Sequence, residues 1–328
     1  MKRSIKILAL SLTIILLVQL IIIVNAQAEQ IILTNNEGYI IVDKNGEGNF
    51  KTIQEAVNHA QSGSTVYVKK GVYSEIIVIK KQISLVGEDK EGTLISPISE
   101  KNKYAIHLGA PEAKIQSLSI KNGAPGLYTN GIRITSPRTE IRDCNIYDTP
   151  VGIAIWTSNN IIDNCHFWGC SDEGIALIGT SYSDCNNNKI TNCVFYENCD
   201  GVELQYSSSN TIADCEFYDN THSGIDAISS SNDNNIISNC RIYNNEVHGI
   251  YLSSSSENQI IDCFVSDNDD GNIVMNKYSK NNEIISNSDS NPEDDTVSIR
   301  DIIYRFLSRR TTSKIWRIIP ILNYLTSF

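Results

Sequence analysis

The sequence predicts an all-β fold, a right-handed parallel β-helix whose stacked rungs are about 23 residues long. Three observations lead to this prediction. Six cysteines recur at intervals of 21 to 28 residues, an apolar residue stands two positions after each of them, and a glycine followed by Ile or Val opens a second short strand in every repeat. Short strands of period 2, separated by Ser, Asn and Asp turns at a regular interval, are typical of a parallel β-helix.

The chain opens with an export signal. Met1, Lys2 and Arg3 precede an almost unbroken apolar stretch from Ile7 to Val24, and Ala26-Gln27-Ala28 follows, a small-x-small pattern that signal peptidases accept. The 18 residues from Ile7 to Val24 are also just enough to span a bilayer. Residues 1–28 are therefore either a cleaved signal peptide or a retained membrane anchor. In both cases we expect an exported protein that is extracellular, on the cell surface or anchored to the membrane.

Residues 29–296 form the predicted β-helix domain. Near its start, apolar residues at positions 53, 56, 57 and 60 have helical spacing, and strand-like segments follow at 64–68 and 75–86. A parallel β-helix has open ends, and a short amphipathic helix commonly covers one of them. We therefore expect a capping helix at the N-terminal end.

Residues 297–328 form an amphipathic, helical and basic C-terminal tail. Apolar residues have helical spacing from Ile299 to Leu307, and several Arg and Lys residues precede the apolar segment 318–325. Two interpretations stay open. The tail is either a second capping helix with a frayed end or an interfacial membrane anchor.

The six repeated cysteines are expected to stack in one column. They are Cys144, Cys165, Cys193, Cys215, Cys240 and Cys263. Stacked in register, they have nearly parallel Cβ vectors and separations too long for disulfides, so we expect buried thiols that pack like small hydrophobic groups. The Asp or Asn before each cysteine is expected to form a ladder of side-chain amide bonds. Cys170, Cys185 and Cys199 lie outside the column, and a disulfide among them stays open.

The composition argues against nucleic acid as a partner. The formal net charge is −11 and the pI is about 5, and an acidic chain repels polyanions unless a local basic surface attracts them.

Two sets of residues resemble a known superfamily. Segments 43–57 and 66–73, Asp-Lys-Asn-Gly-Glu-Gly-Asn-Phe-Lys-Thr-Ile-Gln-Glu-Ala-Val and Val-Tyr-Val-Lys-Lys-Gly-Val-Tyr, resemble the opening of the pectin-lyase-like superfamily, notably pectin methylesterases. The Asn-x-Cys-x-Phe-Tyr and Gly-Ile-x-Leu repeats are similar to the carbohydrate-binding and sugar-hydrolase β-helix repeats. Such repeats also occur in periplasmic maturation factors of nitrous oxide reductase. The resemblance covers about residues 40 to 290 and implies the fold. It does not imply one activity, because the superfamily includes lyases, hydrolases, esterases, epimerases and inert binding proteins.

The chain departs from the superfamily's enzymes at their motifs. It has no counterpart of the esterases' Gln-Asp-Thr-Leu-Tyr or Asp-Phe-Ile-Phe-Gly segments, or of the epimerases' Asp-Pro-His-Asp motif. The catalytic Gln and Asp residues of the esterases therefore cannot be carried over. Arg133 lies on the same outward ladder as Glu203 but three rungs earlier, roughly 14 Å away, which argues against a pectate-lyase site that needs an Arg base beside calcium.

Glu203 and Asp226 are the central candidates for catalysis. The outward positions of the glycine-led strands are, rung by rung, Arg133, Ala154, Ala176, Glu203, Asp226 and Tyr251. Carboxylates on adjacent rungs lie about 5 Å apart, which suits a retaining glycosidase or a cation site. His222 and His248, at the turn before the glycine, are candidates for proton transfer. Asp172, Glu173 and Asp200 are candidate metal ligands at the same turn, with calcium as the ion. The alternative is that an exposed acidic face collects such residues by chance.

The other predicted strand carries an outward row of aromatic residues, Tyr147, Trp168, Tyr196, Tyr218 and Tyr243. Together with Tyr251, these are candidates for substrate binding, because sugar rings pack on aromatic faces. The alternative is that the aromatic rings only stabilise the stacking of rungs. Glu216 and Arg241 are expected to form a salt bridge on this face.

The sequence thus predicts an exported cell-surface β-helix that binds a polysaccharide or cell-surface glycan. If the carboxylates are catalytic, it cleaves that glycan as a hydrolase or lyase. The alternative is a non-catalytic structural or adhesion module. Metal delivery, in the manner of the nitrous oxide reductase maturation factors, has less support because buried cysteines make poor exchange ligands. A membrane is a further partner, through the N-terminal segment or the C-terminal tail.

Overall fold

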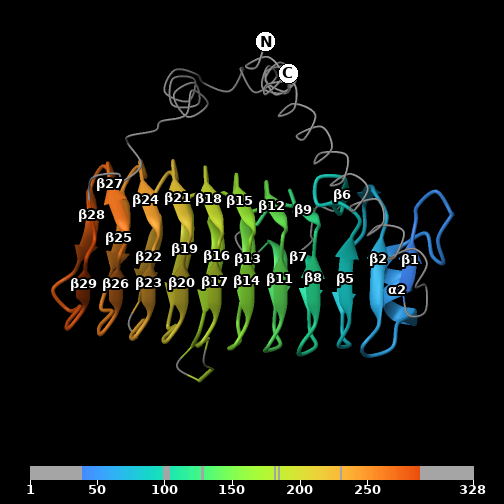
Figure 1. Ribbon diagram of the computed structural model, residues 1–328, viewed down its shortest axis with the longest axis horizontal. Coiled ribbons are helices and arrows are strands. Elements are labelled where there is room, and N and C mark those ends of the chain that lie inside the picture. Colours follow the sequence, from blue (N-terminus) through green and yellow to red (C-terminus); the bar gives the residue numbers. More distant parts are fainter. Residues whose placement is uncertain are drawn as a thin grey trace, which may run out of the picture. The chain divides into compact units, whose positions relative to one another are not determined.

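The computed structural model describes residues 39–98, 104–126, 129–180, 182–183, 185–229 and 231–288. In these ranges the chain forms a parallel β-helix with three sheets, which we call A, B and C, of eleven, nine and nine strands (Figure 1). A full rung has one strand in each sheet, and each strand pairs with the equivalent strands of the rungs before and after it. The predicted fold class is confirmed.

Sheet A consists of β1 (Tyr39–Val42), β2 (Thr65–Val68), β5 (Ser84–Gly87), β8 (Lys114–Gln116), β11 (Glu140–Arg142), β14 (Ile161–Asp163), β17 (Lys189–Thr191), β20 (Thr211–Ala213), β23 (Ile236–Ser238), β26 (Gln259–Ile261) and β29 (Glu283–Ile285). Sheet B consists of β3 (Gly71–Tyr73), β6 (Thr93–Ile95), β9 (Ser119–Lys121), β12 (Asn145–Tyr147), β15 (His166–Trp168), β18 (Val194–Tyr196), β21 (Glu216–Tyr218), β24 (Arg241–Tyr243) and β27 (Phe264–Ser266). Sheet C consists of β4 (Ile77–Ile79), β7 (Tyr104–Leu108), β10 (Asn130–Ile134), β13 (Val151–Ile155), β16 (Glu173–Ile178), β19 (Asp200–Gln205), β22 (Ile225–Ile228), β25 (His248–Leu252) and β28 (Gly271–Met275).

The core is made of columns of identical or similar side chains. The predicted thiol column is confirmed, because all six of its cysteines are buried and unbridged. Cys170, Cys185 and Cys199 are also free thiols. Beside the column, the rings of Phe167, Phe195 and Phe217 stack inside the solenoid with centroids 4.7 Å apart.

The Asp or Asn before each column cysteine does not form the predicted continuous amide ladder, and one link of it is present, from Nδ2 of Asn164 to Oδ1 of Asp143 at 3.3 Å. These residues instead adopt positive φ angles of 50° to 55°, a conformation that Asn and Asp tolerate better than most side chains. The amide ladders lie five residues to either side of the cysteines. One contains Asn160, Asn188, Asn210, Asn235, Asn258 and Asn282, with Nδ2 to Oδ1 distances of 2.9 to 3.2 Å. The other contains Asn198, Asn220, Asn245 and Asn268.

The glycine that opens each sheet C strand has a steric role. A Cβ atom on Gly201 would lie 2.5 Å from the carbonyl oxygen of Gly224 and 2.5 Å from a ring carbon of Phe217. The backbone must therefore pass close to the next rung and to a core ring. Only glycine leaves that space free.

The predicted capping helix is present as α2 (Ile53–His59), which packs against β1, β2 and β4. It buries Ile53, Ala56 and Val57. The Glu75 carboxylate accepts hydrogen bonds from the first backbone N–H groups, those of Ile53 at 2.8 Å and Gln54 at 2.9 Å. The carboxylate thus satisfies donors that have no partner inside a helix.

One turn between sheets C and A is longer than its neighbours. It joins β16 to β17 between Ile178 and Lys189, whereas the next such turn runs from Gln205 to Thr211. Thr180 and Ser183 form a bridge within it, and Cys185 returns to the core. The rung is lengthened without a break in either flanking sheet.

The predicted N-terminal signal or anchor, residues 1–28, and the basic tail, residues 297–328, lie outside the described residues. Within the described ranges, no helix is both long and apolar enough to cross a membrane.

Candidate functional site

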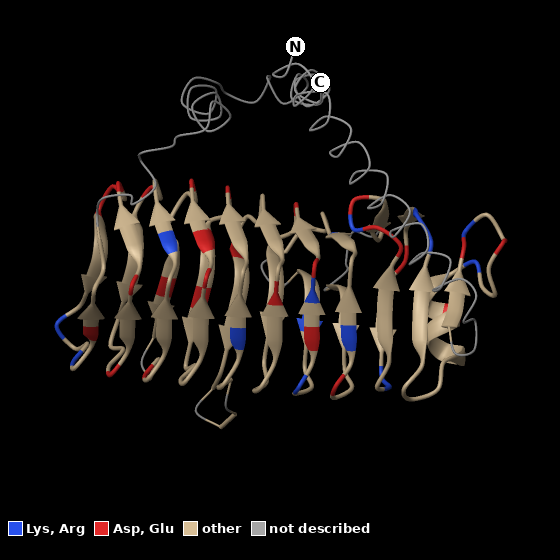
Figure 2. Ribbon diagram, viewed as in Figure 1, with Lys and Arg blue, Asp and Glu red and all other residues tan. Residues whose placement is uncertain are grey.

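The rungs that carry Glu203 and Asp226 are rich in acidic residues. From Asp143 to Cys240 the chain has fourteen Asp and Glu residues, one lysine and no arginine. Figure 2 shows acidic residues on the strands around β19 and β22. A surface of this sign attracts cations and repels polyanions.

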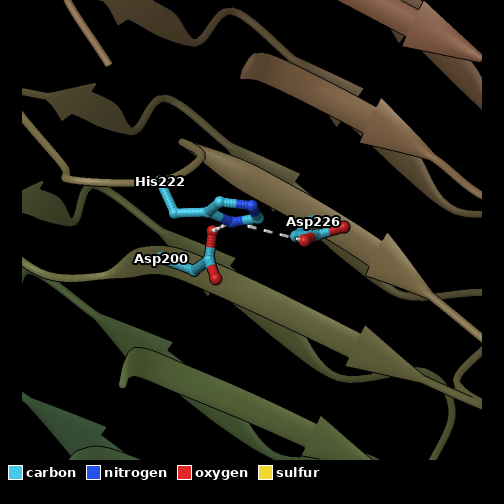
Figure 3. A group of neighbouring side chains, drawn as sticks. All are labelled: Asp200, His222 and Asp226. Carbon is cyan, nitrogen blue, oxygen red and sulfur yellow. Dashed lines mark hydrogen bonds and ion pairs between the residues drawn. The ribbon is translucent and has the colours of Figure 1, made fainter. Parts of the chain in front are cut away.

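Asp200, His222 and Asp226 meet where strands β19 and β22 begin (Figure 3). The Nδ1 atom of His222 lies 2.8 Å from Oδ1 of Asp200 and 3.6 Å from Oδ2 of Asp226. The backbone N–H of Ser223 also donates to Oδ1 of Asp200, at 2.8 Å. Potential ligand atoms of the three side chains all lie within 4.8 Å of one another.

Glu203 and Asp226 are register partners on β19 and β22, so their Cα atoms are about one strand spacing, ~4.8 Å, apart. Gln205 donates a hydrogen bond from Nε2 to Oε1 of Glu203. On the preceding rungs the same ladder continues through Ala176 and Ala154. The carboxyl pair thus adjoins a strip of small apolar side chains.

Burial controls the charge of this cluster. Asp200, Glu203 and Asp226 are only 5%, 8% and 3% exposed. Burial raises the pKa of Glu203 to about 7 against the hydrogen bond from Gln205. Burial, with the charge of Asp200, raises the pKa of Asp226 to about 7. Burial also raises the pKa of Asp200, although its hydrogen bond with His222 opposes the change. The positive charge and hydrogen bonds near these carboxyl groups are therefore too weak to offset the effect of burial on their pKa values.

His222 is the basic member of the cluster. Burial lowers its pKa, but the hydrogen bond to Asp200 and the charges of the surrounding carboxylates outweigh this, so the pKa is raised. His248 lies on the next rung, with its ring centroid 6.4 Å from that of His222. It stacks on Tyr251 at 4.9 Å, and its buried Nδ1 has no hydrogen-bond partner among the described residues.

The three predicted metal ligands are divided by the fold. Asp200 belongs to the ligand cluster with His222. Glu173 is the register partner of Asp200 on the preceding rung, and burial, with the charge of Glu203, raises its pKa. Asp172 instead lines a surface hollow of about 700 Å³, together with Pro125, Asp148, Thr149, Pro150 and Ser171. Within the described ranges, Asp172 and Glu173 are not part of a metal-ligand cluster.

The predicted aromatic row on sheet B is a stack of rings. Neighbouring centroids are 4.5 to 5.8 Å apart, and the ring planes differ by 1° to 9°. The Lys121 ammonium lies 5.7 Å from the centroid of Tyr147 at one end, and the Arg241 guanidinium 5.8 Å from that of Tyr243 at the other. Ring faces inside the row therefore contact one another, which supports the rung-stacking interpretation. The predicted salt bridge between Glu216 and Arg241 is present at 3.5 Å.

Sequence reasoning missed three contributors to this face. Trp156 lies two residues after Ala154 on the outer side of sheet C, with its ring 5.0 Å from the Arg133 guanidinium. Gln205 likewise lies two residues after Glu203. If the period-2 alternation is extended by one more outward position, it predicts both Trp156 and Gln205 on this face. Ser223 acts through its backbone N–H, which no side-chain pattern indicates.

Comparison with known proteins supports the fold assignment. A family model described as a right handed beta helix region matches residues 96–237 and again residues 177–289. The chain belongs to this right-handed β-helix family. A second model, described as pectinesterase, matches residues 39–112 of this β-helix protein, a range that ends before Asp200, His222 and Asp226.

The curated relatives of this β-helix protein match only in part. Pectinesterase/pectinesterase inhibitor 18 of Arabidopsis thaliana is 47% identical over 64 residues, 17% of this chain and 12% of the relative. Probable pectinesterase/pectinesterase inhibitor 17 of the same plant is 28% identical over 162 residues, 39% of this chain and 31% of the relative. The chain thus spans less than a third of either relative's length.

Solved structures share the fold of this β-helix protein. A pectin methylesterase from Aspergillus niger is 15% identical, covers 78% of this chain and 88% of its own, and has a TM-score of 0.52. The enzymatically active domain of tailspike protein 2 of bacteriophage CBA120 is 13% identical, covers 72% and 39%, and has a TM-score of 0.59. At these identities the likeness is one of fold alone.

Proposed function

We propose that the protein is exported, binds a polysaccharide on the outer face of sheet C and cleaves a glycosidic bond there. One observation carries the proposal: Glu203 and Asp226 are buried register partners on adjacent strands. Retaining glycosidases place their two carboxyl groups about 5 to 5.5 Å apart, which is close to the strand spacing that separates these residues. The relatives and the fold favour a carbohydrate as substrate, since pectinesterases are among both.

The chemistry of such a pair is hydrolysis in two steps. One carboxyl group donates its proton to the glycosidic oxygen while the other carboxylate attacks the anomeric carbon and displaces the leaving sugar. Water, deprotonated by the first group, then hydrolyses the sugar ester. His222 contacts both Asp200 and Asp226 and is suited to hold Asp226 in place. His248 remains a second candidate for proton transfer.

The shape and charge around the pair suit a neutral glycan. The hollow lined by Asp172, in the turns that lead from sheet B into sheet C, offers about 700 Å³, and Trp156 presents an aromatic ring beside the apolar strip. Because this face repels polyanions, we expect neutral polysaccharides to bind better than polyuronates. Tyr251 remains a candidate contact, and the stacked aromatic row offers ring edges rather than ring faces. Export rests on the N-terminal segment, and membrane contact through that segment or the C-terminal tail stays a prediction.

The test is to incubate the purified full chain with a panel of neutral and acidic polysaccharides. Binding, new reducing ends and unsaturated products are measured in the same wells. We expect reducing ends on a neutral glycan, lost by about 100-fold or more in Glu203→Gln and Asp226→Asn. Glu216→Gln, a carboxylate on sheet B, is the matched control and should keep full activity. Binding without product would identify a lectin-like protein. If no polysaccharide of the panel is bound or cleaved, the proposal is contradicted and the structural surface module is the remaining interpretation.

A further inference from the structure

We infer that Asp200, His222 and Asp226 form a binding site for one divalent transition-metal ion of the zinc type. The three side chains come from two adjacent rungs, Asp200 from one and His222 and Asp226 from the next, and converge on one point of the outer face of sheet C (Figure 3). This ligand set differs from the expected one, because it contains an imidazole and neither Asp172 nor Glu173.

The geometry places one nitrogen between two carboxylates. Nδ1 of His222 faces Oδ1 of Asp200 at 2.8 Å and Oδ2 of Asp226 at 3.6 Å. Zinc binds imidazole nitrogen and carboxylate oxygen at about 2.0 to 2.2 Å, so an ion between these atoms needs only small side-chain movements. An ion that binds Nδ1 requires this atom to be unprotonated, so any proton held there is released to solvent on binding.

A second observation points to a missing ligand. Oδ1 of Asp226 is buried and has no hydrogen-bond partner among the described residues, and the side chain is only 5% exposed. A buried carboxylate oxygen without a partner is costly. Within the described ranges, His222 is the only basic side chain in an ion pair with Asp200 or Asp226. A divalent cation at this point would compensate both carboxylates.

The ligand chemistry selects a transition metal over calcium. Calcium prefers six to eight oxygen ligands, whereas one imidazole and two carboxylates suit Zn²⁺ or a related ion. Three protein ligands leave a fourth position open, as in catalytic zinc sites. The His222 side chain is 40% exposed above the buried carboxylates, which gives an ion a route from solvent. The backbone N–H of Ser223 holds Asp200 in place, as outer partners of metal ligands commonly do.

The site is argued from its own ligands and does not need glycan cleavage, but it shares Asp226 with the proposed carboxyl pair, and a carboxylate that holds the ion is not free to attack an anomeric carbon. With the ion bound, Asp226 is a ligand, and its register partner Glu203 is the carboxyl group left for proton transfer. If the chelator-treated protein cleaves glycan and does not bind zinc, the zinc site is contradicted and the proposed function stands. If the protein binds zinc and cleaves no glycan, the zinc site stands and the proposed function is contradicted.

The experiment is calorimetric titration of chelator-treated full chain with Zn²⁺, followed by Co²⁺ titration monitored by visible absorption. We expect one ion per chain. We also expect His222→Gln and Asp226→Asn each to weaken Zn²⁺ binding by about 100-fold or more, beyond the usual effect of outer partners. His248→Gln, which removes the imidazole of the next rung, is the matched control and should keep wild-type affinity.

Far-UV circular dichroism must show that each variant is folded, and Asp200→Asn supplies an isosteric third ligand variant. Wild-type affinity in folded His222→Gln, no zinc binding in the wild type, or tighter binding of Ca²⁺ than of Zn²⁺ would each overturn the assignment.

Discussion

The carboxylate of Asp163 accepts a hydrogen bond of 2.7 Å from the hydroxyl of Thr191 on the next rung. It also accepts one of 2.8 Å from Nδ2 of Asn192 and pairs with Arg142 on the rung before. One side chain therefore connects three consecutive rungs. Burial raises the pKa of Asp163, but these partners outweigh it and leave the pKa below its ordinary value.

We expect Asp163 to make the stability of the solenoid depend on acid pH. A carboxyl group with a lowered folded-state pKa contributes stability that is fully present above its unfolded pKa and is lost as the pH falls through the folded value. Asp163→Asn should lower the free energy of unfolding by about 1 to 3 kcal/mol at pH 7. This difference in free energy of unfolding from the wild type should become smaller when the pH falls below 3.8, the ordinary pKa of Asp. Urea denaturation at pH 7 and near pH 3 measures the difference. A difference that does not change with pH would contradict the prediction.

Asn220 should be one of the least replaceable polar residues of the core. Its side chain donates to Oδ1 of Asn245 at 2.8 Å and accepts from Nδ2 of Asn198 at 3.1 Å. Asn220→Ala leaves buried donors and acceptors without partners, so the free energy of unfolding should fall by about 2 to 4 kcal/mol. Thermal unfolding followed by circular dichroism measures the loss. Asn58→Ala on the exposed face of α2 is the control, and equal effects at the two positions would refute the role of the ladder.

Gly201→Ala should destabilise the fold because the new methyl group meets backbone. Its Cβ would lie 2.5 Å from the Gly224 carbonyl oxygen, so we expect a loss of about 2 kcal/mol or more. Gly123→Ala offers a matched control, since a Cβ there meets nothing within 4 Å. Chemical denaturation of both variants gives the comparison. A stable Gly201→Ala protein would show that the rungs separate easily.

The thiol column should resist modification in the native state. Its six cysteines are at most 2% exposed, whereas Cys199 is half-buried. Outside the column, burial raises the pKa of Cys170 and, to about 11, that of Cys199, which slows the reaction of these two thiols because the thiolate is the nucleophile. With Ellman's reagent we expect slow reaction of about one thiol in the native protein and of all nine in guanidinium chloride. Fewer thiols in denaturant would reveal a disulfide.

The sequence predicts sheets B and C because their signals are chemically distinctive. Cys and Gly recur where a small side chain must fit between rungs. Sheet A was predicted only near β2 and β5, in the strand-like segments 64–68 and 75–86. Its strands in the repeats were missed, although an inward isoleucine stands three residues before every column cysteine, at Ile141, Ile162, Ile190, Ile212, Ile237 and Ile260. A strand with one inward residue has too few positions to show alternation. The Asn ladders were missed for a related reason, since asparagine also marks solvent-exposed turns.

The candidate site was predictable in part. Alternation alone places Glu203 beside Asp226, because a period of 2 fixes which residues share a face. The approach of His222 to both Asp200 and Asp226 depends on turn geometry, which the repeat does not determine. The burial of these carboxylates was also beyond the sequence, since residues on the outer face of a sheet were expected to be solvated.

The long turn between β16 and β17 is a position where the protein should tolerate inserted residues. Asn188 follows the extra residues, yet it donates to Asn210 at 3.1 Å and accepts from Asn160 at 2.9 Å. The chain after the loop is therefore in the same register as the neighbouring rungs. Residues inserted at this edge should leave the core packing unchanged. Genetic insertions between Gly179 and Cys185 should be tolerated by the fold, and the same edge can display a foreign peptide.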